Sequence, residues 1–353
     1  MKKRRIIAGA LAAVMLLSCL VLTSCKKQKT KYSEYSLDYF DTVTTITGYE
    51  ESREDFDRVC GEVLAELGEY HRLFTIYHRF EGLENLCTVN ELVGGEHRVV
   101  TVDRRIIDML LYAKEMYQKT DGEVNVAMGS ILSVWHEYRT AGLDEPWAAE
   151  LPPMERLREA AEHVDINNLV IDEENSTVYL KDPEMTLDVG AVAKGYAVEM
   201  VAQSLEAKGI SGYVINVGGN VRTVGTKPDG EAWLAGIENP VEDTAEAYVA
   251  YLELAGESVV TSGSYQRFYT VGDKNYHHII DRETLMPAEG YLSVSVVCRS
   301  SAEADAISTA LFCMPLDKGM ALVESLDGVE VLWITDGGER HFSSGFSSYV
   351  TER

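Results

Sequence analysis

A carboxylate and a hydroxyl stand four residues apart in SSAEADAISTALFCM, residues 300–314. They belong to Asp305 and Thr309, and the apolar residues around them predict a helix. On a helix, this spacing places both side chains on one face, one turn apart. Both oxygens suit Mg²⁺, which prefers hard oxygen ligands. The alternative is a structural role, in which Asp305 forms a hydrogen bond near the helix start and Thr309 packs in the core.

A second candidate site lies in LDVGAVAKGYAVEMV, residues 187–201, where Asp188, Gly190, Lys194 and Gly195 interrupt an apolar run. A Walker loop requires GxxxxGK followed by Ser or Thr, and the order here does not match it. A glycine at the strand exit, free amides in the first helical turn and Lys194 would still form a cradle for a phosphate. Asp188 could accept hydrogen bonds from a ligand ring. A capped helix with a structural Asp–Lys pair explains the same residues.

Two further clusters carry polar residues beside expected strands. In INVGGNVRTVGTKPDG, Gly218 and Gly219 would let the backbone approach a ligand closely, although a bulged hairpin explains them equally well. In YHHIID, residues 276–281, His277 and His278 are adjacent. Adjacent strand residues point to opposite faces, which argues against a two-histidine metal site.

The composition is that of a folded, acidic protein. The chain has 353 residues, of which 46% are apolar, enough for one large domain or two lobes with their own cores. With 32 basic and 57 acidic residues, the formal charge is −25, which disfavours nucleic acid as a partner. The same charge repels a dinucleotide, so a phosphate site needs compensation from a metal, a lysine or helix amides.

The N-terminus has the pattern of an export signal. MKKRR supplies four positive charges, and residues 6–22 are apolar and uncharged. LTSC follows, ends at Cys25, and resembles the lipobox of bacterial lipoproteins. We therefore expect a signal peptide over residues 1–24, a lipidated Cys25, a tether over 25–36, and a body outside the cytoplasm, anchored by lipid to the cell (inner) membrane. An uncleaved transmembrane anchor is the alternative, but 17 apolar residues are few for a span.

The remaining cysteines show no CxxC pair and no metal-ligand spacing. We interpret Cys60, Cys87, Cys298 and Cys313 as buried free thiols. A disulfide stays open in an exported protein, because spacing alone cannot assign one.

Helical patterns account for much of the chain. Apolar spacing predicts a helix over residues 55–74, and Asp103 is expected to cap a second helix that runs to about residue 119. The helix that follows the Asp188 motif is expected to end at Lys208 and Gly209, because helices often end in a lysine followed by a glycine in the left-handed conformation.

Strand patterns lie between these helices without strict alternation. FDTVTTITG, residues 40–48, predicts the first strand, because it is rich in β-branched residues. Two short strands are expected within residues 168–189, and DGG at 336–338 indicates a hairpin. The order favours an α+β fold with mixed sheets and packed helices over a doubly wound sheet. We expect a single domain over residues 37–350.

Together these motifs resemble the ApbE-type FAD:protein FMN transferases. The strongest matches are LDVGAVAKGYA, INVGGNVRTVG, VVTSGSYQRFY, HHIIDRET and EADAISTALF, and the resemblance runs from about residue 40 to residue 349. It implies an ApbE-like fold of two lobes around a central FAD cleft. It also implies transfer of the FMN half of FAD to a threonine hydroxyl of a partner protein, with release of AMP. The acceptor would be a membrane redox subunit or an FMN-binding domain facing the same compartment.

The resemblance further implies roles for individual residues. Mg²⁺ would be held by Asp305, Thr309 and the backbone carbonyl of Ala191. FAD would contact a larger set of residues: Phe40, Thr75, Ile76, Tyr77, Asn125, Val126, Ala127, Asp188, Lys194 and Ile279. His278 is a candidate general base, and Asp281 is another. Many relatives carry a second acid where Ser308 stands, which leaves the identity of the base open.

Two other functions are alternatives to the transferase. A metal-dependent FAD pyrophosphatase would release FMN and AMP with water in place of the acceptor hydroxyl, and the sequence does not separate it from a transferase. A lipoprotein that only binds flavin would not need Asp305 and Thr309 one turn apart.

Overall fold

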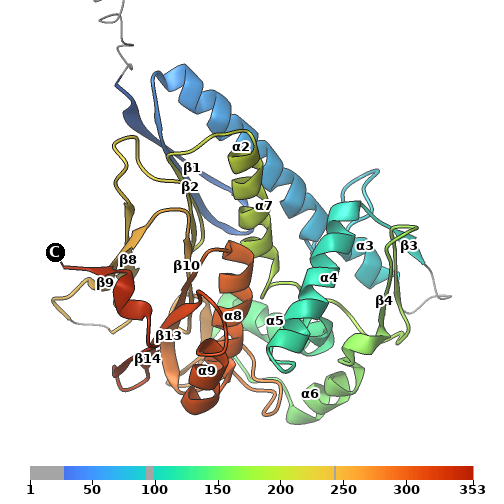
Figure 1. Ribbon diagram of the computed structural model, residues 1–353. Helices are drawn as coiled ribbons and strands as arrows, with labels where there is room; N and C mark the ends of the chain where they lie inside the picture. The colour runs from blue at the N-terminus through green and yellow to red at the C-terminus, as the bar shows by residue number, and fades with distance from the viewer. Residues whose placement is uncertain (1–27, 93–98, 242–243, 353) are drawn as a thin grey trace, which may run out of the picture.

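A computed structural model describes residues 28–92, 99–241 and 244–352 (Figure 1). The predicted signal peptide and the predicted lipidation site, Cys25, lie outside these residues. Within the described ranges, no helix is both long and apolar enough to cross a bilayer.

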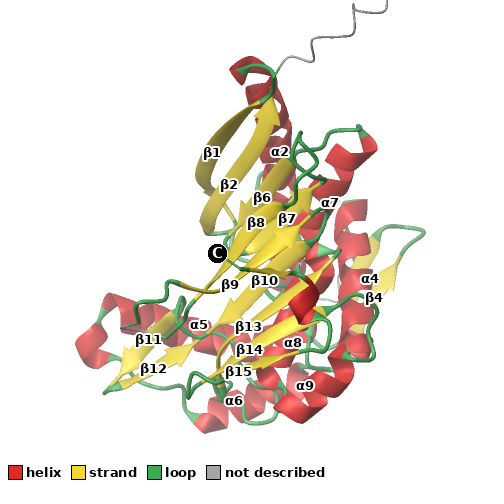
Figure 2. Cartoon of the chain, turned by 60° about the vertical axis from the view of Figure 1, so that its left-hand side comes forward, coloured by secondary structure: helices red, strands yellow, loops and turns green. Residues whose placement is uncertain are grey.

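One antiparallel sheet of eight strands runs through the molecule (Figure 2). Its order is β1-β2-β6-β7-β10-β13-β14-β15. The bounds are β1 (Thr30–Tyr39), β2 (Thr42–Glu50), β6 (Tyr213–Val217), β7 (Asn220–Val224), β10 (Ser258–Gly263), β13 (Tyr291–Cys298), β14 (Glu330–Thr335) and β15 (Arg340–Phe342). The antiparallel pairing and the separate helices confirm the α+β class predicted from the sequence.

Three small antiparallel sheets complete the strands. They are β11 (Phe268–Val271) with β12 (Lys274–His277), β8 (Trp233–Glu238) with β9 (Tyr248–Leu254) and β16 (Val350–Thr351), and β3 (Val100–Thr101) with β5 (Thr177–Leu180) and β4 (Leu169–Asp172). The helices are α2 (Arg53–Phe74), α3 (Leu86–Glu91), α4 (Arg104–Lys119), α5 (Gly129–Asp144), α6 (Met154–Ala160), α7 (Ala193–Ala207), α8 (Ser301–Cys313) and α9 (Leu316–Val323).

The large sheet is covered on both faces. Helices α2, α7 and α8 lie against one face, and the β8-β9-β16 sheet lies against the other (Figures 1 and 2). The main core joins residues of the sheet and of α2, such as Ile46, Phe56 and Ile215. A smaller core between the two sheets contains Leu252 and Phe346. This packing fixes α7 and α8 side by side, which matters for the site below.

Helix ends follow the capping signals read from the sequence. Asp103 accepts a hydrogen bond from the Arg105 amide at the start of α4. Lys208 ends α7, and Gly209 follows with φ of 72°, a conformation that favours glycine. Ser300 caps α8 by accepting from the Glu303 amide, a cap that was not predicted from the sequence.

The beginning of the body differs from the prediction. The tether expected over residues 25–36 is wrong for its last part, because β1 begins at Thr30 and pairs with β2. Tyr32 packs its ring 5.6 Å from that of Phe56 on α2, whereas Ser33 is exposed. Most residues of β1 are polar, so the sequence gives no clear strand pattern here. The side chains that point inward can be identified only once α2 is seen to pack against them. Phe40, predicted to begin the first strand, instead stands in the β1–β2 turn with φ of 54°.

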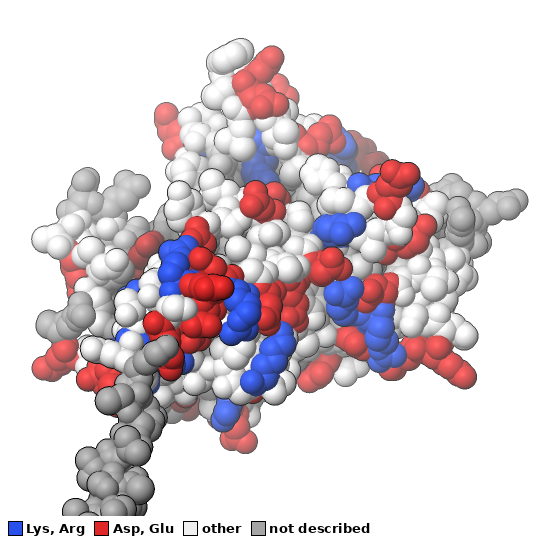
Figure 3. Space-filling model, turned by 90° about the horizontal axis from the view of Figure 1, so that it is seen from above, with Lys and Arg blue, Asp and Glu red and all other residues white. Residues whose placement is uncertain are grey.

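The described residues carry charges of both signs on the surface and four free thiols. Seen from above, Lys and Arg side chains lie among Asp and Glu side chains on that face (Figure 3). Surface pairs such as Arg104–Asp108, at 2.7 Å, reflect this mixture.

Cys60, Cys87 and Cys298 are buried free thiols, as interpreted from the sequence, and Cys313 is free and half-buried.

Candidate active site

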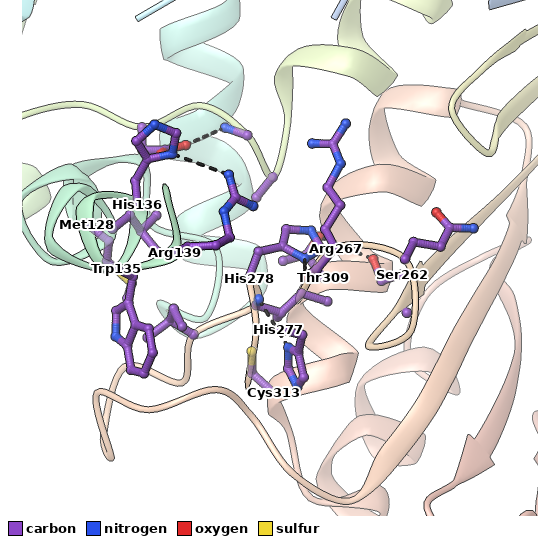
Figure 4. A pocket seen from close by; sticks show the side chains of 18 of the residues that line it. Met128, Trp135, His136, Arg139, Ser262, Arg267, His277, His278, Thr309 and Cys313 are labelled. Carbon is purple, nitrogen blue, oxygen red and sulfur yellow. Dashed lines mark hydrogen bonds between the residues drawn. The ribbon is translucent and has the colours of Figure 1, made fainter. Parts of the chain in front are cut away.

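One cavity gathers most of the residues that the sequence singled out (Figure 4). Its wall comes from α5, the turn before α7, the end of β10, the β11–β12 hairpin with the chain that follows it, and α8. Nine predicted site residues line it: Tyr77, Asn125, Asp188, Ala191, Lys194, His278, Ile279, Asp305 and Thr309. The fold thus brings together segments that are far apart in the sequence.

Asp305 is held where α7 and α8 meet, and the residue is only 3% exposed. Its Oδ2 accepts a hydrogen bond from the Gly195 amide at 2.8 Å, and its Oδ1 accepts one from Asn220 Nδ2 at 3.1 Å. Lys194 Nζ lies 3.4 Å from the same Oδ1. A buried carboxylate is stable only when it is paired and hydrogen-bonded, and these three donors meet that requirement.

The close approach of the two helices depends on Gly195. A Cβ atom at this position would lie 2.4 Å from Asp305 Cβ and 2.4 Å from the Ser301 carbonyl oxygen. Glycine is therefore required here by space, and its absent side chain lets the backbone amide reach the carboxylate.

The start of α7 does not offer the free amides that the sequence predicted. The Val192 and Ala193 amides both donate to the Val189 carbonyl, at 3.0 and 2.8 Å, and the Gly195 amide donates to Asp305. The predicted amide cradle is wrong for these three groups, because a local turn and the α8 carboxylate already accept their hydrogen bonds. The positive charge of this motif comes from its lysine side chain.

Thr309 lines the cavity one turn after Asp305, and its Oγ1 donates to the Asp305 carbonyl at 3.2 Å. Ser308 is fully buried, donates to the same carbonyl at 3.0 Å, and lies 2.9 Å from Ser262 Oγ. Position 308 is not part of the cavity wall. Ser308 itself therefore offers no side-chain oxygen to the cavity.

Asp188 is positioned by backbone hydrogen bonds. Its Oδ1 accepts from the Gly190 amide at 2.8 Å, and its own amide donates to the Val126 carbonyl at 2.9 Å. Desolvation raises the pKa of Asp188, whereas the Gly190 amide and the nearby His136 and Arg139 oppose this rise. Figure 4 shows His136 and Arg139 side by side, with Nδ1 and Nη2 3.3 Å apart.

The adjacent histidines form hydrogen bonds with different carbonyl groups. His278 Nδ1 lies 3.3 Å from the Arg267 oxygen, and His277 Nε2 lies 2.8 Å from the Ala288 oxygen. If Nδ1 carries the proton of a neutral His278, its Nε2 remains an acceptor. Desolvation by the surrounding cavity wall, followed by the charge of Arg267, lowers the pKa of His278, although the residue keeps an exposed surface.

If His278 acts as a general base, its lowered pKa predicts the pH dependence of catalysis. Because its pKa lies below the ordinary value of about 6.5, the ring stays deprotonated as the pH falls through that value. We expect kcat/KM to show no histidine titration near pH 6.5, and His278→Asn to lower it by roughly 10²- to 10⁴-fold, as for loss of a general base. A wild-type ionisation near 6.5 that disappears in the variant would contradict this expectation.

Five predicted FAD contacts do not line this cavity: Phe40, Thr75, Ile76, Val126 and Ala127. Val126 and Ala127 are buried in the main core, and Thr75 caps the end of α2. The Phe40 amide donates to His71 Nδ1 at 3.1 Å. Contact of these five residues with FAD stays a prediction.

Helix α5 supplies cavity residues that sequence reasoning missed. Leu132, Trp135, His136 and Arg139 follow helical spacing on one face, and all four line the cavity. The spacing is visible in the sequence, but a face of this mixed composition is equally consistent with a packed helix. Only the tertiary structure places it opposite α8.

The donors on α8 suit Mg²⁺. Asp305 and Thr309 supply a carboxylate and a hydroxyl, and Ala191 lines the cavity from the turn before α7. In the part of the chain that the structure describes, no three His, Cys, Asp or Glu residues are grouped so that they could hold a metal. Mg²⁺ commonly binds one or two carboxylates together with water and substrate phosphates. The residues therefore fit an ion whose ligands include the substrate.

Comparisons with known proteins identify the family and the fold. The model of the ApbE family matches residues 40–333. An FAD:protein FMN transferase of Klebsiella pneumoniae is 31% identical over 283 residues, covering 77% of this chain and 84% of that protein. An FAD:protein FMN transferase of Treponema pallidum is 32% identical over 279 residues, which cover 75% of this chain and 74% of that protein. The crystal structure of the ApbE protein of Thermotoga maritima superposes with a TM-score of 0.77 at 24% identity, covering 92% and 100% of the two chains.

Proposed function

Because this chain belongs to the ApbE family, it is an FAD:protein FMN transferase, and we propose that it uses Mg²⁺ to transfer FMN to a threonine hydroxyl. The observation that carries the proposal is the placement of Asp305 and Thr309 on the cavity wall, with Lys194 at 3.4 Å from the carboxylate. The acceptor oxygen bonds to the flavin-side phosphorus of FAD. The bond from that phosphorus to AMP breaks, and the hydroxyl proton is released.

Charge neutralisation and positioning supply most of the rate in phosphoryl transfer. Asp305, Thr309 and the Ala191 carbonyl would hold the metal. Bound Mg²⁺ would neutralise charge on the pyrophosphate. Lys194 adds positive charge beside Asp305, which is valuable in a chain with a formal charge of −25.

Other residues of the wall suit the rings of FAD and the incoming hydroxyl. Tyr77 and His136 pair their rings with centroids 5.0 Å apart, and Trp135 lies on the same helix as His136. These flat side chains suit the planar rings of the substrate. His278, kept neutral, is proposed to accept the proton of the acceptor hydroxyl.

The location of the enzyme is also a proposal. LTSC at the end of the apolar leader supports lipidation of Cys25 and attachment to the outer side of the cell membrane. A redox protein anchored to or exposed in the same compartment would then meet the enzyme at high effective concentration. Cys25→Ser is expected to move the protein from the membrane fraction to the soluble fraction, and an unchanged membrane fraction would contradict lipidation.

The products separate the proposed transfer from its alternatives. The chain without its first 25 residues would be mixed with FAD, Mg²⁺ and a threonine-bearing acceptor domain. We expect one AMP for each flavin that stays on the acceptor in a denaturing gel, and none with EDTA. FMN and AMP without labelled protein would indicate a pyrophosphatase, and intact bound FAD would indicate a binding protein.

A further inference from the structure

Asn220 connects Asp305 to the first turn of α8 without lining the cavity. The residue begins β7 and is 1% exposed. Its Nδ2 donates to Asp305 Oδ1 at 3.1 Å, and its Oδ1 accepts from Ser301 Oγ at 3.1 Å. An ionised carboxylate only accepts hydrogen bonds, so Asp305 fixes which end of the amide faces it, and the Ser301 hydroxyl then donates to the amide oxygen.

A buried ion pair between Glu199 and Arg222 lies next to Ser301 and stabilises this arrangement. Ser301 also donates its backbone amide to Glu199 Oε2 at 2.8 Å, and Arg222 Nε lies 3.1 Å from the same oxygen. Glu199 and Arg222 are 4% and 2% exposed. Both charges are therefore compensated inside the protein, and removal of one partner would be strongly unfavourable. The start of α8 is thereby fixed to both α7 and β7.

The orientation of Asp305 follows from these contacts. The Gly195 amide binds Oδ2, and Asn220 binds Oδ1, so hydrogen bonds from two different elements hold the carboxylate. Groups that orient a metal ligand commonly contribute 10- to 100-fold to metal affinity. Asn220 has the chemistry of such a group, because it donates to the ligand and is itself held by Ser301.

We infer that Asn220 is a positioning residue, which sets the affinity for the divalent metal by fixing the Asp305 carboxylate. This inference rests on the proposed function, because it takes Asp305 as a metal ligand. Asn220 acts through Asp305, so its removal should weaken metal binding and leave the contacts of FAD with the cavity wall in place.

Mn²⁺ binding to the mature chain tests the inference without turnover. By titration calorimetry or electron paramagnetic resonance, with Mn²⁺ alone and with FAD present, Asn220→Ala should raise the Mn²⁺ Kd by roughly 10- to 100-fold. Ser301→Ala should act in the same direction with a smaller effect. In the transfer reaction, the Mg²⁺ concentration for half-maximal rate should rise, while kcat at saturating Mg²⁺ recovers.

Thr223→Ala is the matched control. Thr223 lies on the same strand and is 1% exposed, and its hydroxyl forms two hydrogen bonds, with the Glu257 carbonyl and the Gly256 amide, away from α8. It should lower the melting temperature and leave the Mn²⁺ Kd unchanged. An unchanged Kd in Asn220→Ala with a lowered melting temperature would overturn the inference, since Asn220 would then be only structural. A wild-type chain that binds no Mn²⁺ even with FAD would instead overturn the proposed metal site.

Discussion

Asp305→Ala is expected to lower FMN transfer by at least roughly 10²- to 10³-fold, the usual effect of removing one group that stabilises transition-state charge. The variant loses the carboxylate among the proposed metal ligands. It also leaves the Gly195 amide, Asn220 and Lys194 without their shared acceptor. The measurement is kcat/KM for FAD, followed by AMP release at saturating acceptor. Mn²⁺ binding by the same protein is measured alongside it.

Two comparisons make this result interpretable. Asp317→Ala removes an exposed carboxylate from α9, which follows α8, and should leave the rate unchanged. A thermal unfolding scan must show that Asp305→Ala is folded, because unsatisfied buried donors cost about 1–3 kcal/mol each. Metal-dependent transfer at the wild-type rate by the folded variant would exclude Asp305 as a metal ligand.

Gly195→Ala is expected to disturb both the contact between α7 and α8 and the hydrogen bond to Asp305. The new Cβ would stand 2.4 Å from both Asp305 Cβ and the Ser301 carbonyl oxygen, so α7 and α8 would have to separate. Overpacking of this kind typically destabilises a protein by about 1–3 kcal/mol. The shift would also displace the amide that binds Asp305, so we expect transfer and Mn²⁺ affinity to fall together with the melting temperature.

Gly61→Ala provides the matched control on α2. Beyond its chain neighbours and the nearby backbone of α2 itself, no atom lies within 4 Å of the Cβ that this substitution would add. In an open helix interior, alanine is about 0.5–1 kcal/mol more favourable than glycine, so the melting temperature should rise and transfer should not change. Equal effects of the two substitutions would show that the contact between α7 and α8 at Gly195 is not the cause.

Local signals in the sequence predicted much of this structure. The Asp103 cap, the Lys208–Gly209 helix end and the DGG hairpin depend on a few neighbouring residues, and each is present. Asp305 and Thr309 were predictable for the same reason, since helical spacing alone puts them on one face. The family motifs then linked segments that spacing cannot relate.

Features that depend on contacts between distant segments were not predictable in this way. The strand β1 carries few apolar residues, and its inward side chains can be identified only against α2. The role of Gly195 follows from the proximity of α8, and the buried position of Ser308 follows from Ser262 on β10. The α5 face had the correct spacing in the sequence but no local sign of the surface that it meets.

Crystals of the mature chain grown with Mn²⁺ and FAD, measured by anomalous diffraction, test the metal site most directly. We predict an anomalous peak for Mn²⁺ within coordination distance of Asp305, Thr309 Oγ1 and the Ala191 carbonyl. Pyrophosphate oxygens of FAD are expected among the remaining ligands. FAD bound in the cavity with the peak at other residues, or with no peak, would contradict a metal-assisted transfer at this site.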